Sequence, residues 1–446
     1  MTQVPSGPTR TRWLIFSLAC GVSFLLYLHR FTWGVAKPHI GEEFGWDKTT
    51  LSYFDSAFMV SYALGQIPGG MLADWFGSRS ILTAMIVVWT IGLAGTACAW
   101  NFASMFCVRL FFGLGQAGCY PNLNKVSKAW FPPNVRTAVQ GWISSFSGRM
   151  GGAASYIIFA TVCLGYFAMP WRTATLLFAL LGFAGGVIFW IWFRNSPLEH
   201  PLCNSSEAAL IVHQEEGVHH VGKSRLSWRE AARSFNLWML VFQQFTCAFV
   251  DMVFSSWVPF FLVEQAGVNI SSAGWMAALP LMGGAIGGMT GATFQNELIR
   301  RTGSRKWSRR GIGFFGNLMA TILMLSMVQM EGQFAIVTTF ILLKFFADWS
   351  QPTTWATATD IAGPNSASVF AIINTSGSAA GIVSSPIMAG IVDYFSGSDP
   401  KSPVGWSVLF GTLSVVYLAS AFSWLWIDCE RPIEGVARNS GSRESA

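Results

Sequence analysis

The segment GMLADWFGSR, residues 70–79, recurs in altered form as GATFQNELIRRTGSR, residues 291–305. Each copy has a glycine at the end of an apolar run, then polar residues, then Gly-Ser-Arg. In the first copy Asp74 can pair with a nearby base or cap a helix end, whereas Gln295 and Asn296 stand in the acidic region of the second copy. The repeat predicts a chain made of two related halves, each with a polar turn between two helices at this point.

Apolar runs on both sides of these segments predict a membrane protein. Hydrophobic residues make up 52% of the chain and charged residues 11%, against roughly 25% charged residues in a soluble domain. Because a transmembrane helix needs about 20 largely apolar residues, we predict twelve spans, at 13–36, 50–72, 80–100, 103–123, 137–163, 170–194, 237–263, 273–299, 311–330, 333–361, 368–393 and 405–427.

A polar interruption at residues 195–236 divides the spans into six and six. We therefore predict an N-terminal six-helix bundle (1–194), a cytoplasmic linker (195–236), a C-terminal six-helix bundle (237–430) and a cytoplasmic tail (431–446). Two such halves are typical of a rocking transporter with its site between them. His213, His219 and His220 in the linker lack the paired spacing of a zinc site, so no metal and no cofactor is expected.

The distribution of basic residues predicts the orientation. With the N-terminus inside, the cytoplasmic segments hold twenty of the 28 Lys and Arg residues. External loops hold four (Lys37, Lys48, Arg172 and Lys401), and four more lie inside spans (Arg30, Arg109, Arg149 and Lys344). Since basic residues concentrate on the cytoplasmic side, we expect both termini in the cytoplasm and a location in the inner membrane.

The first loop resembles the signature G-x-L-A-D-R-x-G-x-R of the major facilitator superfamily, with Trp75 in place of the usual arginine. Residues 56–79, 108–141 and 373–395 are similar to the anion:cation symporter family within it. This resemblance implies an all-α membrane fold of twelve helices in two pseudo-symmetric bundles. It also implies alternating access and an organic-anion substrate such as galactonate or a hexuronate. Gly70, Asp74, Gly77 and Arg79 are then expected to form a conformational loop.

Three arginines inside the predicted spans are the leading candidates for substrate binding. A charge at membrane depth is costly and marks a functional position, and a guanidinium can bind a carboxylate through two parallel hydrogen bonds. Arg30, with Tyr27 one turn earlier, and Arg109 match arginines that bind substrate carboxylate in the family. Arg149 is an added charge that would favour a dianion if it faces the cavity, or it pairs with a buried aspartate; both readings remain open.

The sequence indicates the coupling ion less clearly than it indicates the substrate-binding residues. Much of the family has acids for proton transfer where this chain has His29 and Gln116. Glutamine cannot titrate, so proton coupling cannot be transferred from the resemblance. His29 and three acids within the spans, Asp55, Asp251 and Asp348, remain candidates for a coupling group. Asp348 lies four residues after Lys344 and is expected to pair with it on one helix face.

Uncharged candidates complete the predicted site. Tyr62 and Asn374 match family positions that hydrogen-bond substrate hydroxyls. Thr353, Thr354 and Trp355 stand where the family has a polar and aromatic wall. For each of these residues, ordinary hydrogen bonding between helices is the alternative.

These residues together predict an ion-coupled transporter of a small organic anion, a sugar acid or other hydroxy-carboxylate, acting as a monomer. The alternatives are an exchanger or uniporter for a dianion, such as a dicarboxylate or phosphorylated compound, and an anion-sensing membrane receptor. The linker and tail are short for a signalling domain. An enzyme is not expected, because the sequence lacks paired catalytic carboxylates, a metal-ligand cluster and a nucleophile elbow.

Overall fold

The computed structural model describes residues 7–131, 135, 139–216, 228–362, 366–397, 402–431 and 433, which contain helices and no strand. The chain forms two compact units. The N-terminal unit comprises Met1–Gly45 and Ala57–His219, and the C-terminal unit comprises Trp46–Ser56 and His220–Ala446. The first turns of one long helix therefore belong to the C-terminal unit, while the rest of that helix belongs to the N-terminal unit.

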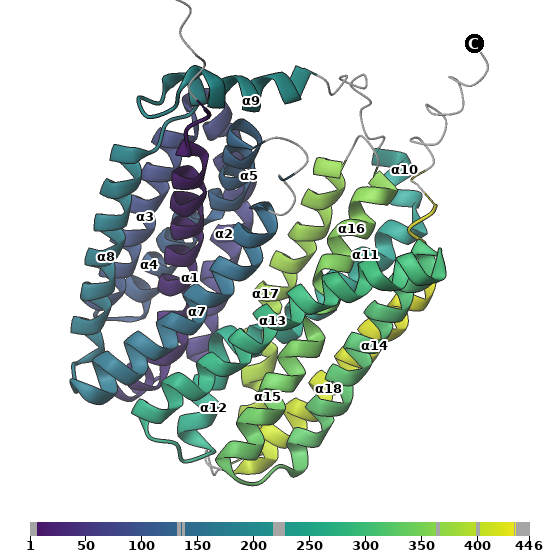
Figure 1. Cartoon of the computed structure of the whole chain (residues 1–446). Helices are drawn as coiled ribbons and strands as arrows, with labels where there is room; N and C mark the ends of the chain where they lie inside the picture. The colour runs from purple at the N-terminus through teal and green to yellow at the C-terminus, as the bar shows by residue number, and fades with distance from the viewer. Residues whose placement is uncertain are drawn as a thin grey trace, which may run out of the picture. The chain divides into compact units, whose positions relative to one another are not determined.

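The N-terminal unit is a bundle of long helices with α9 running across one end (Figure 1). Its helices are α1 (Thr11–Phe44), α2 (Lys48–Phe76), α3 (Ser78–Cys98), α4 (Phe102–Ala117), α5 (Cys119–Trp130), α7 (Gly148–Ser155), α8 (Trp171–Trp192) and α9 (Ser205–Glu216). Two π-helical segments, η1 (Trp142–Ser147) and η2 (Tyr156–Tyr166), flank α7, and η3 (Pro197–Glu199) is a short 3-10 turn.

The C-terminal unit begins with the short α10 (Trp228–Arg233). Its further helices are α11 (Phe235–Met252), α12 (Val258–Glu264), α13 (Ile270–Thr302), α14 (Arg305–Ser326), α15 (Gln333–Ala347), α16 (Ser350–Ala362), α17 (Ser366–Ser396) and α18 (Pro403–Trp426). The π-helical η4 (Val253–Trp257) joins α11 to α12, and the 3-10 turn η5 (Met327–Gln329) follows α14. An apolar core that includes Leu240, Ile361 and Trp424 lies among α11, α16 and α18.

Nine helical stretches of the described residues are long and apolar enough to cross a membrane. The three remaining expected spans coincide with α2, with the run from η1 through α7 to η2, and with α13. The all-α fold with transmembrane helices predicted from the sequence is confirmed.

The first span is longer than predicted. The apolar run was expected to end at residue 36, with Lys37 in an external loop, but α1 continues through Pro38 to Phe44 and Lys37 is fully buried. Lys48 and Arg172, also expected in external loops, lie in the first turns of α2 and α8. A lysine ended the apolar pattern of α1, but it did not end the helix.

The repeated loop forms a tighter turn than its sequence predicted. Gly70 and Asp74 lie within α2, and Arg79 lies within α3, so the expected polar turn is reduced to Gly77 between the two helices. Gly77 has a φ of 81°, and Gly303 in the second copy has a φ of 68°. Glycine adopts this left-handed region without the steric cost that a Cβ adds. The side chain of Asp74 lies outside the described residues.

Arginines in the first copy and just after the second anchor equivalent helix ends. Arg79 donates from Nε and Nη2 to the carbonyl oxygen of Trp190 at 3.0 and 2.7 Å, in the last turn of α8. Arg310 donates from Nε to the carbonyl oxygen of Ile427 at 2.7 Å, just after α18. Arginine near a helix C-terminus satisfies carbonyls that have no partner inside the helix. Each arginine therefore ties the start of the third helix of its half to the end of the sixth.

A buried carboxylate holds the start of α1 against α9. Glu207, which is fully buried, accepts hydrogen bonds from the backbone N–H groups of Thr11 and Arg12, each at 3.0 Å, and from the Thr9 hydroxyl at 2.5 Å. These amides belong to the first turn of α1 and lack partners within the helix. Burial opposes ionisation of Glu207, but the hydrogen bonds from Thr9, Arg12 and Thr11 outweigh it and lower its pKa.

We expect Glu207→Gln to lower the stability of the protein by about 1–2 kcal/mol, the scale of a lost helix cap. Because the folded-state pKa is lowered, the carboxylate stabilises the protein above the unfolded pKa of about 4.3 and loses that effect as the pH falls through the folded value. Thermal unfolding of both proteins should show a difference at pH 7 that shrinks below pH 4. Glu199→Gln, an exposed neighbour, is the control; a pH-independent difference for Glu207→Gln would contradict the assignment.

Candidate functional site

Arg30 on α1 is the centre of a cluster in the N-terminal unit. Its guanidinium carbon lies 5.1, 5.0 and 4.7 Å from the ring centres of Tyr27, Phe58 and Tyr62. Such contacts between a cation and aromatic faces are attractive. Nη2 is buried and has no hydrogen-bond partner among the residues that the structure describes. The aromatic cage thus holds the charge and leaves one end of the guanidinium available to a ligand.

Gln116 on α4 fixes the orientation of Arg30. Its Oε1 accepts a hydrogen bond from Arg30 Nε at 3.0 Å, and its Nε2 donates to the Leu26 carbonyl oxygen at 3.1 Å. Gln116 is fully buried. These two bonds assign the amide orientation, because only the oxygen can accept from arginine and only the nitrogen can donate to a carbonyl. The arginine is therefore held by a neutral group, which does not offset its positive charge.

Arg109 on α4 shares an aromatic neighbour with Arg30. Its guanidinium carbon lies 4.4 Å from the Trp33 ring centre and 5.0 Å from the Phe58 ring centre. The side chain is buried, with 4% of its surface exposed. Phe58 therefore contacts both guanidinium groups, and the structure brings together Tyr27, Arg30, Tyr62, Arg109 and Gln116. Their contact with a substrate stays a prediction.

The sequence reasoning missed two aromatic residues of this cluster. Phe58 precedes Tyr62 by four residues on α2, a spacing that places both on one helix face and could have identified it. Tyr120 has its ring 6.4 Å from that of Tyr27, and its hydroxyl is 2.9 Å from Ser23 Oγ. Neither residue is charged at neutral pH, so a pattern of charged residues within the spans does not indicate them.

His29 lies on a different face of α1, although it is adjacent to Arg30 in sequence. The Trp89 indole N–H donates to His29 Nδ1 at 3.1 Å, and His29 is fully buried. Because Nδ1 accepts a hydrogen bond, the neutral ring carries its proton on Nε2. The imidazole packs among α1, α3 and α8, where a Cβ at Gly182 would collide with its Cε1. A coupling role for His29 stays a prediction.

Two other charged candidates, Arg149 and Asp55, lie in different units of the protein. Arg149 is half-buried on α7, one residue after Gly148, whose backbone lies against the Tyr27 ring. Asp55 is 1% exposed in the C-terminal unit, where it accepts hydrogen bonds from Ser256 Oγ at 2.9 Å and Ser385 Oγ at 2.5 Å. Substrate contact by Arg149 and ion coupling by Asp55 stay predictions.

Thr353 and Thr354 on α16 are fully buried, and their hydroxyl groups form hydrogen bonds to residues of other helices. The Thr353 hydroxyl donates to Gln295 Oε1 at 2.5 Å, and the Thr354 hydroxyl donates to Gln243 Oε1 at 3.0 Å. This arrangement favours the alternative of interhelical hydrogen bonding. Trp355 is half-buried and stacks on Phe370 with ring centres 4.2 Å apart.

Asn374 is half-buried on α17. Its expected contact with substrate hydroxyls stays a prediction, as do those of Thr353, Thr354 and Trp355.

A second cluster of charges lies in the C-terminal unit. Lys344 on α15 forms ion pairs with Asp251 on α11 and with Asp348 at the end of α15, the latter at 2.7 Å. The expected pair of Lys344 and Asp348 is present. Asp251, for which no partner was evident from the sequence, is paired with the same lysine.

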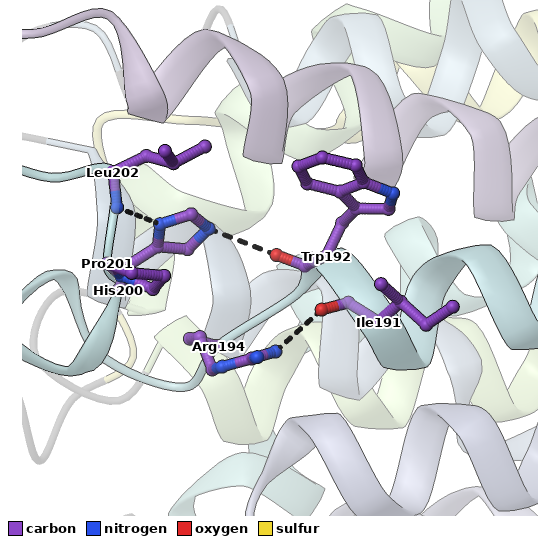
Figure 2. A pocket seen from close by; sticks show the side chains of 6 residues that line it. All are labelled: Ile191, Trp192, Arg194, His200, Pro201 and Leu202. Atoms are coloured by element: carbon purple, nitrogen blue, oxygen red, sulfur yellow. Dashed lines mark hydrogen bonds between the residues drawn. The ribbon is translucent and has the colours of Figure 1, made fainter.

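A hollow of about 180 Å³ follows α8, lined by Ile191, Trp192, Arg194, His200, Pro201 and Leu202 (Figure 2). Its polar atoms hold the turn. His200 Nε2 lies 3.0 Å from the Trp192 carbonyl oxygen, and His200 Nδ1 accepts from the Leu202 N–H at 3.2 Å. Arg194 donates to the carbonyls of Ile191 and Phe193. These bonds cap the end of α8. The polar atoms that line the hollow are therefore used to stabilise the turn after that helix.

In the part of the chain that the structure describes, no group of three or more His, Cys, Asp or Glu side chains is placed to hold a metal ion. The side chains of His213, His219 and His220 lie outside that part.

Two helical units with long apolar helices are typical of a multi-pass membrane protein. Residues 19–385 match the sequence profile described as Major Facilitator Superfamily. The chain belongs to this superfamily, so it is a membrane transporter and not an enzyme.

Curated relatives and a solved structure agree with this family. The chain is 27% identical to the probable sulfoacetate transporter SauU of Cupriavidus necator, over 87% of this chain and 89% of the relative. It is 28% identical to the probable galactarate/D-glucarate transporter GudP of Escherichia coli, over 86% and 88%. A bacterial homologue of the human lysosomal transporter Spinster, inward-facing and occupied, has a TM-score of 0.71, 17% identity and coverage of 99% and 98%. The resemblance to the major facilitator superfamily is thereby confirmed, and the curated relatives are consistent with its anion:cation symporter family.

Proposed function

We propose that this protein is a secondary transporter that moves a small organic anion across the cytoplasmic membrane by alternating access. The observation that carries the proposal is Arg30, a caged cation whose Nη2 is buried and has no hydrogen-bond partner among the described residues. A carboxylate or sulfonate can accept hydrogen bonds from such a guanidinium and offset its charge. Tyr27 and Tyr62 bring hydroxyl groups to the same place for a hydroxylated substrate.

The relatives' substrates narrow the anion class. Sulfoacetate, galactarate and glucarate each carry two acidic groups, and two of them are sugar acids. Arg109 supplies a second buried cation beside Phe58 for a second acidic group. The substrate class is therefore a sugar acid or other small acid, with dianions the first to test. The excess of basic residues in the segments assigned to the inside favours cytoplasmic termini in an inner membrane.

Counterflow in proteoliposomes tests the proposal. Purified protein is reconstituted in vesicles preloaded with sulfoacetate, galactarate, glucarate or a hexuronate, and entry of the labelled compound is measured. We expect exchange of at least one acid and no exchange of galactitol, the uncharged counterpart of galactarate. Equal entry of galactarate and galactitol, or no exchange of any acid, would refute an anion transporter.

A second candidate is an anion exchanger or uniporter, which is favoured by the non-titrating Gln116 beside Arg30. Such a protein needs counter-substrate inside the vesicle or a substrate gradient, and a pH gradient should not drive accumulation.

A further inference from the structure

The turn between α13 and α14 in the C-terminal unit is rich in positive charge. Residues 300–310 contain no acidic side chain and six basic ones, Arg300, Arg301, Arg305, Lys306, Arg309 and Arg310. Four of the six lie in the first six residues of α14, where the helix N-terminus adds a partial positive charge of its own. The start of α14 therefore does not offset the charge of these four side chains.

Carboxylates of the same unit offset only part of this charge. The ion pairs join Glu297 to Arg300 and Arg301, Asp360 to Arg309, and Asp428 to Lys306 and Arg431. Among the described residues, Arg305 is exposed and forms no ion pair, and Arg310 donates to the neutral carbonyl oxygen of Ile427. The exposed side chains of Arg300 and Arg301 share one carboxylate. The turn thus presents an excess of positive charge to its surroundings.

An apolar stripe with a gap runs along α14 from the same turn. Trp307 and Phe315 are 64% and 45% exposed, and Ile322 continues the stripe with 52% of its surface exposed. Gly311 lies between the two aromatic rings on this helix face, and an added Cβ there would meet no atom within 4 Å. Eight residues separate the rings along the chain, which corresponds to about 12 Å along a helix. The stripe therefore has an open gap between Trp307 and Phe315.

Arg310 connects the charged turn to the apolar stripe. Its guanidinium carbon lies 5.3 Å from the ring centre of Trp307, and only its Nε donates to Ile427. The stretch that begins at Arg305 is long and apolar enough to cross a membrane, so the turn before it lies at a membrane surface. Tryptophan is enriched at that depth, and anionic lipid headgroups attract basic residues there.

We propose that the α13–α14 turn binds an anionic phospholipid. The phosphate accepts hydrogen bonds from the Nη groups of Arg310, and the exposed arginines of the turn attract the negative charge of the headgroup. One acyl chain lies over Gly311, between the rings of Trp307 and Phe315, and continues along the stripe. A free phosphate ion would use the charge but not the apolar gap beside it, so the site favours a lipid.

Native mass spectrometry of the full-length protein in detergent tests the charged part of the site. Dioleoyl phosphatidylglycerol and dioleoyl phosphatidylcholine are titrated separately, and we expect the anionic lipid to bind more tightly. Arg305→Gln and Arg310→Gln should each weaken its binding about fivefold, because each removes one positive charge near the membrane surface. Arg305 has no ion pair to lose, and glutamine at residue 310 keeps an N–H donor for the Ile427 carbonyl oxygen. Arg233→Gln, an exposed change in α10, is the matched control and should bind like wild type.

A second pair of variants tests the place of the acyl chain. Gly311→Leu fills the gap with a residue that favours helix, and it should weaken binding of dioleoyl phosphatidylglycerol at least about fivefold. Gly411→Leu fills an equally open position on α18 and should have no effect. Equal affinity for the two lipids, or equal losses in Arg233→Gln and Arg305→Gln, would overturn the proposal. So would unchanged binding by Gly311→Leu, or displacement of the lipid by inorganic phosphate at similar concentration, which would indicate a site for a soluble anion.

Discussion

Substituting Arg30 with alanine should reduce uptake of the anionic substrate at least about 100-fold, because losing the charged partner of a buried anion costs about 3 kcal/mol or more. The substitution removes the one group in the aromatic cage that carries a full positive charge, while the rings of Tyr27, Phe58 and Tyr62 remain. Direct binding of the substrate to purified protein, measured by calorimetry or thermal shift, should fall with uptake.

Arg30→Lys distinguishes geometry from charge. A lysine keeps the charge but cannot offer two parallel N–H groups, so we expect an intermediate loss of roughly tenfold. Arg301→Ala removes an exposed arginine of α13 and should transport like wild type. Normal uptake by Arg30→Ala would assign the anion site to other residues.

Substituting Gln116 with glutamate should weaken substrate binding about tenfold or more at neutral pH, since a hydrogen bond to a charged group contributes about 1.5–3 kcal/mol. The new carboxylate would lie where Oε1 now accepts from Arg30 at 3.0 Å and would form an ion pair with it. Its other oxygen would face the Leu26 carbonyl, to which Nε2 now donates. Both changes act against an anion that needs the free charge of Arg30.

Acidification should reverse this effect. Protonation removes the charge of the new side chain and restores a donor toward Leu26. Because the ion pair with Arg30 holds the pKa of the new carboxyl below the usual value of about 4.3, binding by Gln116→Glu should approach that of wild type as the pH falls from about 5 to about 3. Binding curves across this range measure the effect, and Gln329→Glu, an exposed change in η5, is the control. An equal loss at every pH would indicate disturbed packing and contradict the electrostatic explanation.

The sequence predicts the fold well because the apolar runs and the Gly-Ser-Arg repeat both depend on local pattern. The predicted helix boundary is wrong where a charged residue is buried. Lys37 interrupts the apolar run of the first span, but tertiary structure encloses it within α1 and the helix continues to Phe44. The prediction of a polar turn at residues 70–79 is also wrong, because polar residues there are part of a helix: α2 continues through Asp74 to Phe76.

For the candidate site, residue type and position selected Arg30, Tyr62, Arg109 and Gln116 as candidates, but did not predict what each one contacts. His29 and Arg30 are neighbours in sequence and face different helices, which follows from the rotation of about 100° per helical residue. The pairing of Asp251 with Lys344 joins residues from two helices far apart in the chain, so no local pattern indicates it. Phe58 carries no charge, and its contact with both arginines emerges only in three dimensions.

The neutral amide of Gln116 also bears on how this transporter can evolve. Glutamine and glutamate codons differ in a single nucleotide, so one point mutation places a titratable acid against Arg30 without changing the length of the side chain. If Arg30 binds the anion as proposed, a lineage can gain or lose acid sensitivity at that position in one step, while every helix of the bundle stays the same. Among homologous genes, this codon is the place to look for shifts in the acidity at which transport operates.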